Sequence, residues 1–318
     1  MLPQTIDYDA DITCIDTEQV RPGLAAAYLI RGGDQYAFIE CGTSLSVPGL
    51  LAVLEARGIA REQLAYVMPT HVHLDHASGA GLLMRELPAA RLVVHPRGAK
   101  HLIDPSKLIE GASAVYGAEN LPKLYGEILP VPEARVLVAE DNYELDLGGR
   151  PLRFIDAPGH ARHHYAIWDA TSRGWFTGDT FGISYRETDD AAGPYLFPTT
   201  TPVQFEPDAW RNTLDRFLAV GPEAAFLTHY GRVGNFAKLA EDLRRGLDHY
   251  ERIGLSLIDV PNRHEQLKAA LLQLALEELR ARGNTLTATE AGALLAMDIE
   301  LNAQGLGVWL DKRKTARP

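Results

Sequence analysis

The sequence of 318 residues is poor in several features that would each indicate a class of protein. Its two cysteines, Cys14 and Cys41, are too few for a disulfide framework and suit a reducing compartment. It has no apolar run long enough to span a membrane, and the acidic residues 1–11 do not resemble a signal peptide. The 31 Lys and Arg are dispersed among 42 Asp and Glu, so no basic surface for nucleic acid is expected. These absences predict a cytoplasmic protein that binds neither nucleic acid nor membrane.

A cluster of metal-binding side chains lies at His71, His73, Asp75 and His76. It follows an apolar run (64–68) that predicts a buried strand, and side chains of an extended backbone alternate in direction, so three of the four can face one side. Imidazole and carboxylate suit Zn²⁺, and Fe²⁺ and Mn²⁺ accept the same ligands. A chance cluster is improbable, because the chain contains only 11 histidines.

The segment Thr70-His-Val-His-Leu-Asp-His76 resembles the T-H-x-H-x-D-H signature of the metallo-β-lactamase superfamily. Three further motifs of that family follow in order: Ala157-Pro-Gly-His160, Thr177-Gly-Asp179-Thr and Phe226-Leu-Thr-His229. The resemblance extends from about residue 25 to 231. It implies an α/β fold of the metallo-β-lactamase type, a four-layer αββα sandwich.

The resemblance also implies the ligands of two divalent metal ions. The expected set is His71, His73 and His160 for one ion, Asp75, His76 and His229 for the other, and Asp179 as the bridge. Zn²⁺ is the expected metal, with Fe²⁺ or Mn²⁺ as alternatives. The family usually has aspartate, which supports the ligands, where this chain has Glu40. By the same resemblance, a hydroxide shared by two ions would attack a carbonyl, and Asp75 would hold it and pass a proton to the leaving group.

The family motifs end near residue 231, and only helical patterns follow them. This order predicts a catalytic domain over residues 1–234 and a C-terminal helical region over 235–318. Within the first, residues 97–134 indicate a helical insertion that forms either a pocket wall or structural padding. The C-terminal region should contain helices at 236–253, 261–282 and 287–297. Apolar positions 267, 271, 274 and 279 form a stripe on the middle helix that must be buried, either against the core or in a homodimer.

Aromatic residues indicate where a small-molecule substrate would bind. Tyr116 and Tyr125 lie in the insertion, and Tyr185 and Tyr195 lie in a loop that follows Asp179. These four side chains are the predicted lining of an apolar pocket over the metals. Two more histidines, His163 and His164, follow His160 closely. They could themselves bind a metal, but the ligand set is complete without them, so the favoured interpretation is that they support the ligands or line the pocket.

The ligand set predicts a hydrolase that cleaves an ester, thioester or lactone. The basic residues that hold glutathione in glyoxalase II cannot be located in this sequence. One alternative is an iron-dependent enzyme of sulfur and oxygen redox chemistry, similar to persulfide dioxygenases. The other is a metal-bound regulatory protein without turnover, against which the complete set of seven ligands argues.

Overall fold

The computed structural model describes residues 2–200 and 203–315, with the side chains of all of these except residues 114–116. The chain divides into two compact units that are interleaved in sequence. Unit 1 comprises Met1–Asp156, His163–Gly178 and Pro222–Arg232, and unit 2 comprises Ala157–Arg162, Asp179–Gly221 and Val233–Pro318. The predicted domain boundary at residue 234 stays a prediction. Among the described helices, none has the length and apolar character that crossing a membrane requires.

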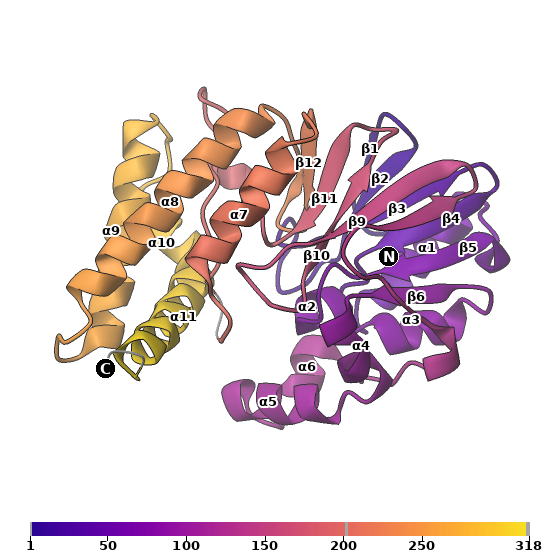
Figure 1. Cartoon of the computed structure of the whole chain (residues 1–318), viewed down its shortest axis with the longest axis horizontal. Helices are drawn as coiled ribbons and strands as arrows, with labels where there is room; N and C mark the ends of the chain where they lie inside the picture. Colours follow the sequence, from indigo (N-terminus) through magenta and orange to yellow (C-terminus); the bar gives the residue numbers. More distant parts are fainter. Residues whose placement is uncertain (1, 201–202, 316–318) are drawn as a thin grey trace. The chain divides into compact units, whose positions relative to one another are not determined.

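Unit 1 contains two mixed β-sheets (Figure 1). The first has seven strands in sequence order: β1 (Thr5–Tyr8), β2 (Ile12–Asp16), β3 (Ala26–Gly32), β4 (Gln35–Ile39), β5 (Leu64–Met68), β6 (Arg91–Val94) and β7 (Val136–Val138). Strands β1 to β4 pair antiparallel, and β4 to β7 pair parallel. The end of β2, the start of β3 and the ends of β4 and β5 therefore lie at one edge of this sheet, which we call the carboxyl edge.

The second sheet has six strands in the order β13-β12-β11-β10-β9-β8. These are β8 (Tyr143–Leu147), β9 (Arg150–Asp156), β10 (Tyr165–Asp169), β11 (Gly174–Gly178), β12 (Ala224–Leu227) and β13 (Gly231–Val233). Strands β11 and β12 are parallel, and β8 to β11 are antiparallel. The strand predicted over residues 64–68 is confirmed as β5 of the first sheet, while β1 and β13, which are short, were not predicted.

The alternation of side chains along β3 places the core on both faces of the first sheet. Tyr28 and Ile30 belong to a buried cluster with Phe154 and Phe176 of the second sheet. Leu29 belongs instead to a cluster with three helices, namely α1 (Val47–Ala56), α3 (Ala80–Glu86) and α4 (Pro96–Ile103). Between the sheets, the ring centroids of Tyr28 and Phe176 lie 5.2 Å apart, edge to face. The first sheet thus has helices on one face and the second sheet on the other, as a sandwich requires.

The insertion is helical, as predicted. It comprises α4, α5 (Ser106–Tyr116) and α6 (Leu121–Tyr125), and a short helix α2 (Leu74–Ala77) precedes it. Leu121 and Tyr125 of α6 are buried in a small cluster with Leu74 of α2. The insertion therefore packs against the helix that carries Asp75 and His76 of the metal-binding motif.

Unit 2 consists mainly of five helices: α7 (Pro207–Leu218), α8 (Phe236–Ser256), α9 (Arg263–Ala281), α10 (Ala288–Leu294) and α11 (Ala296–Thr315). Helix α9 contacts α8, α10 and α11. It buries Leu267, Leu271, Ala275 and Leu279, so the predicted stripe is corrected at one position: Leu274 is half-buried, because a spacing of four residues favours Ala275. The predicted helix at 287–297 is also corrected. Helix α10 ends at Leu294, and α11 begins at Ala296 after a single residue, Leu295.

Candidate metal centre

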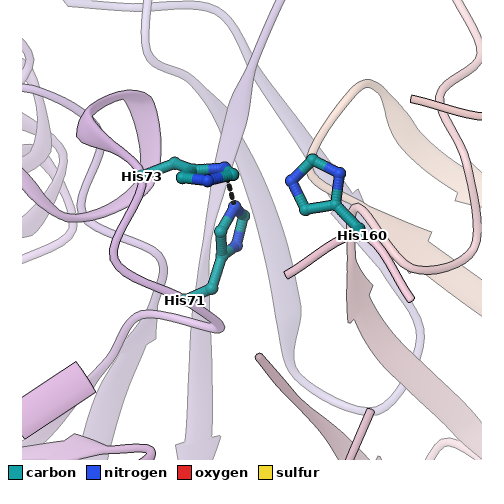
Figure 2. A group of neighbouring side chains, drawn as sticks. All are labelled: His71, His73 and His160. Atoms are coloured by element: carbon teal, nitrogen blue, oxygen red, sulfur yellow. Dashed lines mark hydrogen bonds between the residues drawn. The ribbon is translucent and has the colours of Figure 1, made fainter. Parts of the chain in front are cut away.

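The metal-binding motif follows β5 at the carboxyl edge of the first sheet. His71 and His76 are fully buried, whereas the Asp75 side chain is 29% exposed. His71 Nε2 lies 2.8 Å from His73 Nδ1, and Figure 2 shows these two rings joined by this interaction. Figure 2 also labels His160, which belongs to unit 2 and is described with that unit below.

Unit 1 brings three predicted ligands together as a candidate metal-binding group, Asp75, His76 and His229. Their ligand atoms lie within 4.8 Å of one another. Asp75 Oδ2 is 3.6 Å from His76 Nε2 and 3.4 Å from His229 Nε2. His229 follows β12, which runs parallel to β11. Two imidazole nitrogens and one carboxylate oxygen are a donor set that fits a divalent metal ion.

In both imidazoles of this group, Nδ1 contacts an oxygen atom of the protein. His76 Nδ1 lies 3.0 Å from Glu40 Oε1, and His229 Nδ1 lies 2.8 Å from the carbonyl oxygen of Leu24. A carbonyl oxygen only accepts, so His229 Nδ1 must carry the proton, and in the neutral ring Nε2 then carries the lone pair. This is the arrangement of a histidine that binds a metal through Nε2, and it strengthens the fit of the group to a metal.

The Glu40 carboxylate contacts residues of the metal-binding motif and of the segment that follows β12. Its side chain is 1% exposed, and its carboxylate accepts hydrogen bonds from Thr70 N at 3.0 Å and from Thr228 Oγ1 at 3.0 Å, in addition to its contact with His76. The residue has φ of +64°, which few residues other than glycine adopt. The longer glutamate therefore supports the residues around the ligands from the position where the family usually has aspartate.

The other two predicted ligands come together in unit 2. His160 is fully buried, its Nδ1 lies 2.9 Å from the carbonyl oxygen of Thr199, and its Nε2 lies 3.5 Å from Asp179 Oδ2. Gly159 is required before His160, because a Cβ there would lie 2.5 Å from Cβ of Trp210. Each unit thus places its own predicted ligands in a group, and the complete seven-residue assignment stays a prediction.

The two additional histidines lie beside the motif in unit 1. The fully buried His164 ring stacks on His71 with centroids 4.7 Å apart, and the half-buried His163 ring lies 5.3 Å from His73. Gly178 leaves room for this packing, since a Cβ there would be 2.5 Å from His164 Nε2. Gly178 belongs to the motif Thr177-Gly-Asp179-Thr, whereas no motif in the sequence indicated the role of the Leu24 carbonyl, because a backbone group carries no signal in residue type.

The predicted pocket tyrosines have the following surroundings. In unit 2, the Tyr185 hydroxyl donates to Asp298 Oδ1 at 3.1 Å, and the Tyr195 hydroxyl donates to Glu278 Oε2 at 2.8 Å. Burial and the Glu278 carboxylate raise the pKa of Tyr195 well above its usual value. Tyr125 is buried within unit 1, and the side chain of Tyr116 lies outside the described residues. A substrate-binding role for these four residues stays a prediction.

Neither cysteine has the properties of a nucleophile. Burial raises the pKa of the Cys41 thiol well above its usual value, and the neighbouring Glu40 carboxylate raises it further. Burial, with a smaller effect of the Asp16 carboxylate, raises the pKa of Cys14 to about 12. Both thiols therefore remain protonated at neutral pH.

Comparison with known proteins identifies the class to which this fold and these ligands belong. The family model of the metallo-beta-lactamase superfamily matches residues 20–229. The chain belongs to this superfamily, and the predicted α/β fold of the metallo-β-lactamase type with C-terminal helices is confirmed.

Particular relatives extend the comparison. The chain is 27% identical to the metallo-beta-lactamase fold-containing protein ST1585 of Sulfurisphaera tokodaii, over 81% of this chain and 92% of that protein. The solved structure of ST1585 matches with a TM-score of 0.62, covering 90% of this chain and 93% of the other. The chain is also 27% identical to human acyl-coenzyme A thioesterase MBLAC2, over 49% and 57% of the two chains. A hydroxyacylglutathione hydrolase of Roseobacter denitrificans matches at 27% over 46% and 48%.

Proposed function

We propose that this chain is a metal-dependent hydrolase that cleaves an ester, thioester or lactone bond of a small molecule. The observation that carries the proposal is the group of Asp75, His76 and His229, whose imidazoles are fixed through Nδ1 by Glu40 and the Leu24 carbonyl. The similarity to an acyl-coenzyme A thioesterase and to a hydroxyacylglutathione hydrolase favours a thioester as the substrate. In both cases the chain spans about half of the relative's length.

The proposed ligands are the seven residues that the sequence predicts. His71, His73 and His160 would hold one ion, Asp75, His76 and His229 a second, and Asp179 would bridge them. Zn²⁺ suits these donors, and Fe²⁺ and Mn²⁺ are accepted by the same set. When bound, such ions lower the pKa of a coordinated water to about 7 and polarise a carbonyl.

The chain's own side chains account for the movement of the proton. Asp75 is the partly exposed acid of its group, so a water and a substrate can reach its carboxylate. We assign to Asp75 the orientation of the attacking water and the transfer of its proton to the leaving group. A side-chain nucleophile is not required, which agrees with the raised pKa values of the two thiols.

The test compares hydrolysis with oxygen consumption. Protein loaded with zinc or with iron is assayed against a panel of thioesters, esters and lactones, beside an oxygen electrode and with chelated protein as the control. We expect the zinc form to cleave at least one activated acyl compound without oxygen uptake, because hydrolysis needs a Lewis acid and no change of valence. Oxygen uptake with a persulfide, seen only with iron and without hydrolysis by either form, would assign the chain to sulfur redox chemistry. Metal binding without turnover of any compound would favour the regulatory protein.

A further inference from the structure

The carbonyl oxygen of Thr199 determines how the His160 ring is presented in unit 2. It lies 2.9 Å from His160 Nδ1. Because a carbonyl oxygen only accepts, Nδ1 carries the proton, and in the neutral ring Nε2 then carries the lone pair that a metal ligand requires. Nε2 is also the atom that lies 3.5 Å from Asp179 Oδ2. The position of one backbone carbonyl group therefore fixes both the tautomer and the orientation of a proposed ligand.

Asn302 of α11 holds the backbone on both sides of Thr199. Its Oδ1 accepts from Thr200 N at 2.6 Å, and its Nδ2 group donates to the Pro198 carbonyl oxygen at 3.2 Å. Thr200 Oγ1 donates to the Asn302 carbonyl oxygen at 3.0 Å. The Asn302 side chain is 1% exposed, and burial of an amide is unfavourable unless its polar atoms are hydrogen-bonded. The buried amide thus fixes the two residues that flank the Thr199 carbonyl.

Two glycines allow the C-terminal helices to approach this backbone closely. A Cβ on Gly305, one turn after Asn302 in α11, would lie 1.4 Å from the Thr200 carbonyl oxygen. A Cβ on Gly246 of α8 would lie 2.9 Å from Cδ of Pro198. Residues at a spacing of three share one face of a helix, so Asn302 and Gly305 together form the surface of α11 that receives the loop.

We propose that Asn302 is a positioning residue of the metal centre, which holds the Thr199 carbonyl at His160 Nδ1 so that His160 offers Nε2 to the ion. This inference rests on the proposed function, in which His160 is a metal ligand. It also gives the C-terminal helices a part in metal binding, because α11 supplies both Asn302 and Gly305. A purely structural asparagine would instead stabilise the fold without a selective effect on one metal ion.

Asn302→Ala should weaken the binding of one of the two metal ions by about tenfold and leave the other unchanged. Competition between the protein and a chelator for zinc measures both constants, at a temperature where circular dichroism shows the variant to be folded. Asn284→Ala is the matched control, because the Asn284 amide also donates to backbone carbonyls of a unit 2 loop, those of Thr188 at 3.0 Å and Asp189 at 3.3 Å. Equal constants in the two variants would overturn the proposal.

Gly305→Ala displaces the same backbone while it keeps the Asn302 amide, and it decides the question if Asn302→Ala does not fold. The added Cβ cannot remain 1.4 Å from the Thr200 carbonyl oxygen, so the loop must move, and the same metal constant should weaken by about tenfold. Gly307→Ala is the control on the same helix, since the nearest atom to its Cβ would be the end of the Arg263 side chain at 4.0 Å. Identical metal constants in the two glycine variants would contradict the proposal.

A double-mutant cycle with His160→Ala shows whether Asn302 acts through this ligand. His160→Ala should abolish one of the two binding steps. Adding Asn302→Ala to it should leave the remaining constant unchanged, because the two substitutions remove parts of one interaction. A further fall of about tenfold in the remaining constant would indicate a general effect on the fold and would overturn the positioning role.

The tautomer of His160 can be measured without metal. In metal-free protein labelled with ¹⁵N-histidine, in mildly alkaline buffer, the His160 signals are assigned by their loss in His160→Ala. They should report protonation at Nδ1, and this proton should exchange with water at least about tenfold faster in Asn302→Ala. Protonation at Nε2 in the unchanged protein would overturn the proposal. Since neither this measurement nor the metal constants require turnover, a protein that binds two ions and cleaves no compound would refute the hydrolase and leave the role of Asn302 standing.

Discussion

At the residue scale, the metal centre depends on which nitrogen of each imidazole carries a proton. His229 and His76 each direct Nδ1 toward an oxygen, the Leu24 carbonyl in one case and the Glu40 carboxylate in the other. The two partners differ in an instructive way. The carbonyl only fixes the tautomer of its imidazole. The carboxylate also increases the basicity of the imidazole ring, and therefore its strength as a metal ligand. Glu40 is for this reason the residue outside the predicted ligands whose charge has the largest expected effect.

Glu40→Gln should weaken metal binding at the group of Asp75, His76 and His229 by about tenfold to a hundredfold. The amide keeps the size of the side chain but loses the charge, and it cannot accept from Thr70 N, Thr228 Oγ1 and His76 together as the carboxylate does. Competition with a chelator measures the affinity. Glu140→Gln, at an exposed position, is the control. An affinity equal to that of the control would show that the Glu40 charge does not act on the metal.

Asp75→Asn should retain at least one metal ion and lower kcat by about 10²-fold or more, the scale of a general acid–base contribution. Asparagine has the same shape but cannot take up and release the proton. Because the side chain is 29% exposed, the substitution leaves no buried polar group of residue 75 unsatisfied, so the denaturation midpoint of the protein stripped of metal should not change. Metal analysis and steady-state kinetics are the measurements, with Asp208→Asn at an exposed position as the control. Full activity of Asp75→Asn would remove the assigned role.

The residues that the sequence could predict are those whose side-chain type carries the chemistry. His71, His76 and His229 belong to motifs, and unit 1 places all three at one site. The residues that support them could not be found in this way. Leu24 acts through its carbonyl, which every residue possesses, and it lies 205 positions from His229 in sequence. Glu40 could be located only by family resemblance, and its three partners depend on how β4, β5 and β12 are placed in space.

At the element scale, a strand or helix could be predicted where its apolar residues form a clear run or recur at a regular spacing. A strand that is defined only by its hydrogen bonds to a neighbouring strand could not be predicted. Strand β5 follows from an apolar run, and α9 follows from apolar residues at helical spacing. Strand β1 has mostly exposed side chains, so no apolar pattern indicates it, and it exists because it pairs with β2. Helix α11 was missed beyond residue 297 because its buried positions include Asp298 and Asn302, which interrupt the apolar stripe.

The end of β11 provides a test of how closely an element is fitted to the site. Gly178→Ala should lower the free energy of unfolding by about 2–4 kcal/mol. Its φ is +49°, and the added Cβ would lie 2.3 Å from Thr70 Oγ1 and 2.5 Å from His164 Nε2. Gly221→Ala is the matched control, since its φ is +63° and its Cβ would meet no atom within 4 Å, so it should lose only about 1–2 kcal/mol. Urea denaturation measures both; equal losses would show that the contacts at Gly178 are easily relieved.

At the scale of the whole molecule, the chain forms each of its two units from segments that alternate in sequence. The predicted ligands follow the same pattern, with five in unit 1 and two in unit 2. The apolar stripe of α9 is buried against the other C-terminal helices. This stripe was one reason to expect a homodimer, and its burial within the chain removes part of that reason. Self-association through these helices stays a prediction, for which Leu255 and Met297 remain as exposed apolar residues.

Metal binding should stabilise the whole molecule, because the ligands are assembled only in the folded chain. His76 and His229 are far apart in sequence, so the unfolded chain offers no comparable site, and an ion that binds the native state alone stabilises it by mass action. At free zinc about 100-fold above its dissociation constant the gain is about 2.7 kcal/mol, which for a chain of this length corresponds to a rise in Tm of about 4 °C. Scanning calorimetry of chelated and zinc-loaded protein measures it. His229→Ala should lose most of the increment, and an unchanged Tm in the zinc-loaded protein would contradict the proposed metal centre.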